Sequence, residues 1–103
     1  MELTALLRKI EACPQLYVGD AGIPGLRHFL CGYILSEKER DPGYQDWLFS
    51  DFTAFLAEKY RDGRGLDFAL LIAANEADGA STDTFFRLLR EFADAAEPGR
   101  EKR

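Results

Sequence analysis

The amino-acid sequence predicts an all-α protein, built as one compact bundle of about five helices. Three observations support this fold class. Apolar residues recur at helical spacing in successive segments, short breaks rich in proline and glycine separate these segments, and hydrophobic residues make up 47% of the 103 residues, enough for one dense core. We expect residues 1–97 to form this single helical domain and residues 98–103 to form a polar, flexible tail.

The first helix is expected at residues 2–12, with a stripe of apolar side chains to bury: Leu3, Leu6, Leu7 and Ile10. Pro14 should end it, because proline lacks a backbone donor and pushes the preceding residue out of helical geometry. Gly19 and Gly22 can take the positive φ angles that reverse the chain. We therefore expect residues 16–18 to fold back as a short apolar plug against the core.

The second helix is expected at residues 24–39, because Pro24 suits a first helical turn, where its missing N–H is harmless. Residues 40–43 contain a proline and a glycine and interrupt the pattern. A third helix should then run from about Tyr44 to Arg61. It is the most aromatic helix, and its buried face is expected to consist of Leu48, Phe52, Phe55 and Leu56.

Residues 66–74 are apolar nearly all round, and we interpret them as a helix in the centre of the bundle, with a buried strand as the alternative. The fifth helix should begin after Gly79, with Ser81 or Thr82 as its N-cap, and should stop before Pro98. Its expected buried stripe is Phe85, Leu88, Leu89 and Phe92.

Negative charge is concentrated in the C-terminal half of the chain. The net charge is −5, and residues 41–97 carry twelve acidic and five basic side chains, whereas residues 1–40 carry five of each. Such a surface repels nucleic-acid phosphates and anionic membranes, and it favours the approach of a basic protein partner. The alternative is that these charges only keep an aromatic-rich domain in solution.

The N-terminal residues 1–13 alternate charged and apolar side chains, which is unlike a signal peptide. No apolar run approaches the roughly 20 residues that a membrane-spanning helix needs. We therefore expect a cytoplasmic protein without a membrane partner, in which both cysteines remain thiols.

Few side chains could carry chemistry. Cys13, His28 and Cys31 could form a three-ligand zinc site, but structural zinc uses four ligands, and both cysteines have apolar neighbours, so we expect them to pack as core thiols. His28 has no orienting carboxylate and is expected at the surface or its boundary. The acidic residues within 37–41 alternate with basic ones, as in a solvated helix end. We therefore predict no catalytic, cofactor or metal site.

Turn and core residues follow a distinctive order along nearly the whole chain: Leu6-Leu7 and Ile10, then Pro14, Leu16-Tyr17 and Gly19, then Leu26, Phe29-Leu30 and Gly32-Tyr33, then Phe52, Ile72, Phe85-Phe86 and Phe92. This order resembles that of small bacterial proteins of the immunity type. Those proteins accompany polymorphic or contact-delivered toxins, and each binds its cognate toxin and blocks it. The resemblance implies a scaffold and a binding function, and it transfers no active site.

We therefore expect a protein that binds and blocks a cognate toxin or effector, by occlusion through an acidic face. The alternative is a non-enzymatic adaptor or chaperone for an effector or another protein partner, and an enzyme ranks last because no coherent acid, base, nucleophile or metal set is present. The side chains predicted to contact the partner are two aromatic and four acidic ones: Tyr44, Trp47, Asp46, Asp67, Glu76 and Asp78. For the two aromatic residues we favour the alternative that neighbouring helices cover them, because large rings are highly buried on average.

Overall fold

The computed structural model describes the backbone of residues 2–101 and the side chains of residues 2–95. Within that range the chain forms helices and no strand, and it is 73% helical in one compact unit, which confirms the all-α fold class. The elements in chain order are α1 (Leu3–Ala12), α2 (Pro14–Val18), α3 (Gly22–Arg40), the π-helical turn η1 (Leu48–Phe52), α4 (Thr53–Tyr60), α5 (Phe68–Asn75) and α6 (Thr82–Glu101).

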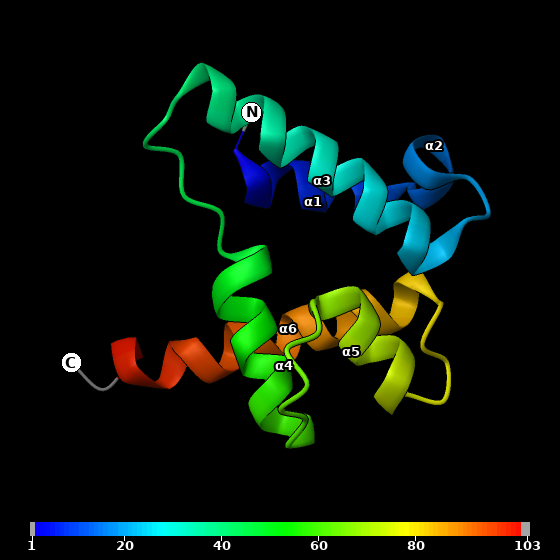
Figure 1. Cartoon of the computed structure of the whole chain (residues 1–103), viewed down its shortest axis with the longest axis vertical. Helices are drawn as coiled ribbons and strands as arrows, with labels where there is room; N and C mark the ends of the chain where they lie inside the picture. Colours follow the sequence, from blue (N-terminus) through cyan, green and yellow to red (C-terminus); the bar gives the residue numbers. More distant parts are fainter. Residues whose placement is uncertain (1, 102–103) are drawn as a thin grey trace.

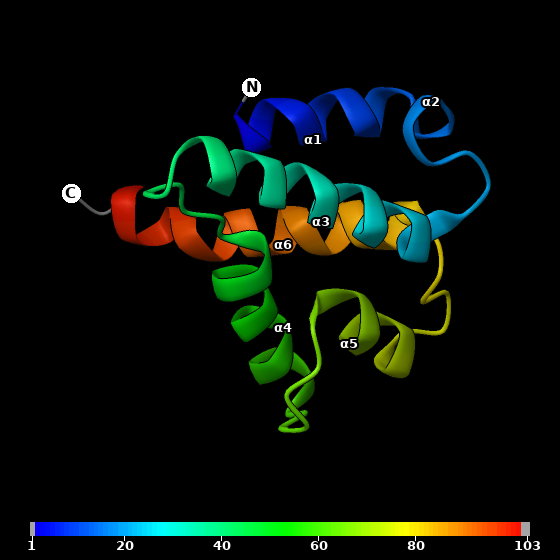
Figure 2. The ribbon, with the colours of Figure 1, turned by 45° about the horizontal axis from the view of Figure 1, so that its top comes forward.

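The three longest helices give the molecule its shape. Helices α1, α3 and α6 lie with their axes roughly along one direction, and α4 and α5 lie on the side of the molecule away from α1 (Figure 1, Figure 2). The start of α3 is tied to the loop before α6, because the backbone N–H of Ile23 donates to the carbonyl oxygen of Ala80 at 2.8 Å. This arrangement leaves one surface between α1 and α6 and another between α3 and α5.

A cluster of phenylalanine rings forms the centre of the core. Phe52, Phe68 and Phe85 are fully buried, and their rings meet in edge-to-face or tilted pairs with centroids 5.5 to 6.1 Å apart. Each such pair stabilises the fold by about 0.5–1.5 kcal/mol beyond the contribution of the surface area that it buries. The buried stripe predicted for the first helix is confirmed, and Leu26, Leu30 and Ile34 of α3 are buried as well.

The segment after Pro14 differs from the prediction. Residues 14–18 form the short helix α2 instead of a plug, with Pro14 in its first turn. Leu16 points outward and is 76% exposed, whereas Tyr17 and Val18 pack against the core. Gly19 and Gly22 take positive φ angles of 57° and 63°, as predicted, and so reverse the chain.

The third helix begins later than predicted. The backbone N–H of Tyr44 donates to the carbonyl of Asp41 and that of Gly43 to its carboxylate, so a turn occupies the expected helix start. The chain becomes helical only at η1, where the Phe49 N–H donates to the Asp46 carboxylate at 2.8 Å. Local side-chain hydrogen bonds at two aspartates therefore decide where the helical segment starts.

Residues 68–75 are helical, so the strand alternative for residues 66–74 is wrong. The prediction that this helix is buried all round is also wrong. Phe68 and Ile72 lie in the core, but Leu70 is 52% exposed on the outer side of α5. The helix lies at the edge of the molecule because α4 and α3 cover only its inner face.

Helix α6 continues through Pro98 and Gly99 to Glu101, beyond its predicted end at residue 97. A proline removes one hydrogen bond from a helix and can bend it without ending it. Residues 102–103 of the predicted tail lie outside the described residues. Ser81 caps the start of α6, because its hydroxyl oxygen accepts from the Asp83 N–H at 3.1 Å. Across the described helices, none is long and apolar enough to cross a membrane.

Candidate functional site

Asp46, the first of the predicted acidic contact residues, is used inside the fold. Its carboxylate accepts the hydrogen bond from Phe49 at the start of η1, and its side chain is only 8% exposed. The Lys38 ammonium lies 3.8 Å from its second oxygen. A carboxylate that is covered and bonded to backbone has little surface left for a partner.

Asp67 joins two helices. One carboxylate oxygen accepts from the Leu70 N–H at 3.1 Å and so caps the start of α5. The other accepts from the Arg27 side chain at 2.6 Å, which links α5 to α3 across 40 residues of sequence. The hydrogen bond and the charge of Asp67 raise the pKa of Arg27.

Glu76 follows α5 and holds two other elements. It accepts a hydrogen bond from the Tyr60 hydroxyl at 2.5 Å and one from Arg87 of α6 at 2.8 Å. Burial and the neighbouring carboxylate raise the pKa of Tyr60, and the hydrogen bond from Tyr60 lowers the pKa of Glu76. Asp46, Asp67 and Glu76 therefore serve the fold, and their contact with a partner stays a prediction.

The other three predicted contact residues have different surroundings. Asp78 is exposed in the loop between α5 and α6. Tyr44 is partly buried, and burial raises the pKa of its hydroxyl, which has no hydrogen-bond partner among the described side chains and backbone. Trp47 is also partly buried and stacks on Phe92 with ring centroids 5.8 Å apart. Neighbouring helices thus cover most of both aromatic residues, the alternative that the sequence favoured.

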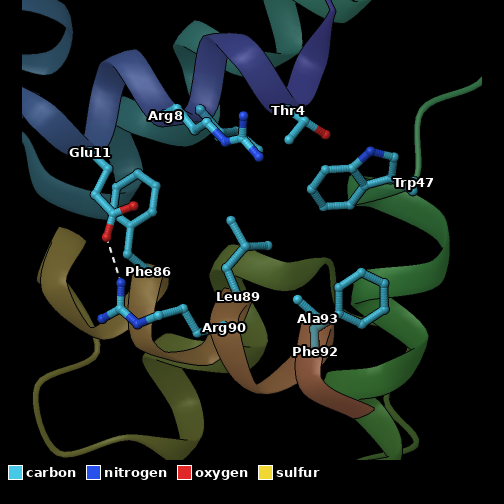
Figure 3. A pocket seen from close by; sticks show the side chains of 10 residues that line it. Thr4, Arg8, Glu11, Trp47, Phe86, Leu89, Arg90, Phe92 and Ala93 are labelled. Carbon is cyan, nitrogen blue, oxygen red and sulfur yellow. Dashed lines mark hydrogen bonds and ion pairs between the residues drawn. The ribbon is translucent and has the colours of Figure 1, made fainter. Parts of the chain in front are cut away.

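Trp47 borders a hollow of about 470 Å³ between α1 and α6, which we call the α1–α6 groove (Figure 3). Trp47 stands at one end, and an ion pair between Glu11 and Arg90, 2.5 Å apart, stands at the other. The Arg8 side chain extends from α1 over the space between them. The remaining lining residues are Thr4, Leu7, Phe86, Leu89, Phe92 and Ala93.

A second surface, the α3–α5 face, consists of two adjacent hollows of about 570 and 340 Å³. Arg27 lines both, and its ion pair with Asp67 stands at their junction. Leu70 lines the larger hollow and Leu35, which is 63% exposed, lines the smaller one. The lining residues include Pro24, His28, Ala73, Ala77 and Gly79 of the larger hollow and Cys31, Lys38, Asp46 and Phe49 of the smaller.

The thiols do not both pack in the core. Cys13 is exposed at the junction of α1 and α2, which corrects the expectation that it is a core thiol, and Cys31 is half-buried on α3. Cys13 is the single residue between α1 and α2, outside the buried stripe of α1. His28 is exposed, as expected. No group of three or more possible metal ligands occurs among the described residues.

Sequence reasoning missed the exposed leucines of the α3–α5 face and the arginines that line the two surfaces. Leu35 follows the buried Ile34 of α3, so its exposure follows from the helical period of that stripe. Leu70 carried no such signal, because residues 68–74 are all apolar. The positions of Arg8 at the α1–α6 groove and of Arg27 beside Asp67 depend on how helices distant in the sequence pack.

We compared the chain with known protein families, curated proteins and solved structures, and no match was found in any of the three.

Proposed function

We propose that this chain is a non-enzymatic binding protein of the immunity type, which associates with a cognate toxin or effector and blocks it by occlusion. The order of turn and core residues supports the class of protein. One structural observation supports a binding role: the α3–α5 face carries two exposed leucines, Leu35 and Leu70, beside hollows that a partner's side chains can enter.

Apolar contact on this face supplies affinity. Fully burying a leucine side chain contributes about 1.5–3 kcal/mol, and each of these two leucines still exposes more than half of its surface. The hollows beside them are lined by further apolar side chains, including Pro24 and Phe49. An apolar centre with polar residues around it is the usual anatomy of a protein–protein interface.

Charge at the edge of the same face favours a basic partner. Asp78 is exposed, and its sequence neighbours Ala77 and Gly79 both line the larger hollow. The net charge of −5 attracts a basic surface from a distance. The acidic contact of this proposal is thus centred on Asp78, while the partly buried carboxylates of Asp46, Asp67 and Glu76 hold the elements around it in place.

The direct test is protection. The protein that co-purifies with this chain at native expression level is identified, expressed alone to measure its toxicity, and expressed again with the wild-type chain. We expect growth to be restored and the partner's activity to be blocked in the complex. A partner that stays fully active in a stable complex would instead identify an adaptor or chaperone.

A pair of matched variants locates the contact. Leu70→Glu introduces a charge on the α3–α5 face, whereas Leu16→Glu makes the same change at an even more exposed leucine on α2, outside that face. We expect Leu70→Glu to abolish protection with unchanged helicity, and Leu16→Glu to retain it. Loss of protection in Leu16→Glu alone would place the contact elsewhere.

A further inference from the structure

The α1–α6 groove shares no lining residue with the α3–α5 face, and its walls are chemically simple. Leu7, Phe86, Leu89 and Phe92 make them apolar, and Trp47 adds the face of an indole ring. The groove has a volume of about 470 Å³. Small-molecule sites in proteins typically enclose about 300–1,000 Å³ and are mostly apolar.

Side chains mark both ends of the groove. Trp47, held by its stack on Phe92, stands at one end, and the Glu11–Arg90 ion pair joins α1 to α6 at the other (Figure 3). A partner helix lying in a groove needs open ends, because it extends beyond its contact residues in both directions. The groove is thus bounded at both ends by side chains, which favours a compact ligand over a helical segment of another protein.

The charge of the groove is positive in a protein that is negative overall. Arg90 is neutralised by Glu11, whereas Arg8 has no carboxylate within ion-pair distance among the described side chains. Its guanidinium reaches over the apolar walls (Figure 3). A guanidinium in this position matches one anionic group, because it can donate two parallel hydrogen bonds to a carboxylate.

We propose that the α1–α6 groove binds a small anionic amphiphile, a monocarboxylate with a medium-length apolar chain. The chain lies against the leucine and phenylalanine walls, and the carboxylate meets Arg8. The walls supply affinity, since they are already formed and already apolar, and Arg8 supplies the preference for a negative headgroup.

The protein carries its own reporter, because Trp47 is its single tryptophan and lines the groove. We would titrate the full chain with decanoate, at concentrations below its self-association, and follow tryptophan fluorescence. Decanol serves as the neutral ligand with the same chain. We expect both ligands to cause a saturable change in fluorescence, and we expect decanoate to reach half-saturation at a lower concentration than decanol.

Two pairs of variants separate the roles of charge and space. Arg8→Gln should weaken decanoate binding by about fivefold, the size of one exposed ion pair, and leave decanol binding unchanged. Its control is Lys9→Gln, at an exposed residue of α1 outside the groove. Ala93→Phe, which fills the groove, should abolish binding of both ligands, whereas Ala95→Phe, outside its lining, should not.

The outcomes discriminate between explanations. No saturable response to decanoate, or equal effects of Arg8→Gln and Lys9→Gln, would overturn the proposal. A response only to vesicles of anionic lipid would overturn it in favour of a membrane surface, and a response only to an acidic amphipathic peptide would do so in favour of a protein segment. The result is independent of toxin protection, which depends on residues of the α3–α5 face.

Discussion

Removing the Asp67 side chain should destabilise the fold, whatever its effect on partner binding. Asp67 caps α5 through the Leu70 N–H and pairs with Arg27 on α3. Loss of an N-cap costs about 1 kcal/mol. The ion pair is partly exposed on the Arg27 side, so its loss adds about 0.5 kcal/mol.

Asp67→Ala should therefore lower the free energy of unfolding by about 1.5 kcal/mol and the Tm by at least about 6 °C for a chain of this size. Asp67→Asn keeps a side-chain oxygen that can cap the helix and loses only the charge, so it should cost about 0.5 kcal/mol. Arg27→Gln should match Asp67→Asn, since both remove the same ion pair.

Urea unfolding followed by circular dichroism measures these differences, with Asp78→Asn as the control at an exposed acid. Equal losses in Asp67→Ala and Asp67→Asn would refute the capping role. Unchanged stability in Asp67→Ala together with lost toxin protection would refute the whole assignment and return Asp67 to the partner interface.

Two further predictions concern backbone conformation and acid stability. Gly22→Ala should destabilise the protein by more than about 2 kcal/mol in thermal unfolding, because φ is 63° there and the new Cβ would collide with the Ala80 carbonyl oxygen. Its control is Gly32→Ala in the middle of α3, where nothing lies near the new Cβ, and this change should stabilise the protein by about 0.5–1 kcal/mol. The hydrogen bond from Tyr60 lowers the folded-state pKa of Glu76. The ionised Glu76 therefore stabilises the folded protein fully above the ordinary carboxylate pKa, and this stabilisation is lost as pH falls through the folded-state pKa. Glu76→Gln should therefore flatten the acid side of the stability profile in urea titrations, and a profile unchanged from the wild type would contradict this.

Local periodicity was sufficient for the elements whose stability depends on one buried stripe. The spacing of Leu3, Leu6, Leu7 and Ile10 predicts α1 to within one residue, and all four side chains are buried. The prolines and glycines between the apolar segments likewise predicted that the chain reverses at Gly19. These features depend on residues that are close in the sequence, so a single sequence is enough to predict them.

Tertiary contacts explain what the sequence could not predict. The Arg27–Asp67 pair spans 40 residues, and the Arg90–Glu11 pair spans 79. No local pattern indicates which basic residue will meet which acid across such distances. The start of η1 was missed although its cause is local. Asp46 accepts a hydrogen bond from the Phe49 N–H, but in the sequence an aspartate that makes such a bond looks the same as an exposed one.

The paired acids affect a partner differently at long range and at contact. Pairing Asp46 with Lys38, or Glu76 with Arg87, joins an acid to a half-exposed base and leaves the net charge of −5 unchanged. Attraction of a basic partner over about 8 Å, the screening distance at physiological salt, depends on that net charge and therefore survives the pairing. Contact itself requires desolvated side chains, and those acids are already occupied. In the proposed complex, the exposed leucines of the α3–α5 face supply contact area that does not require these ion pairs to break.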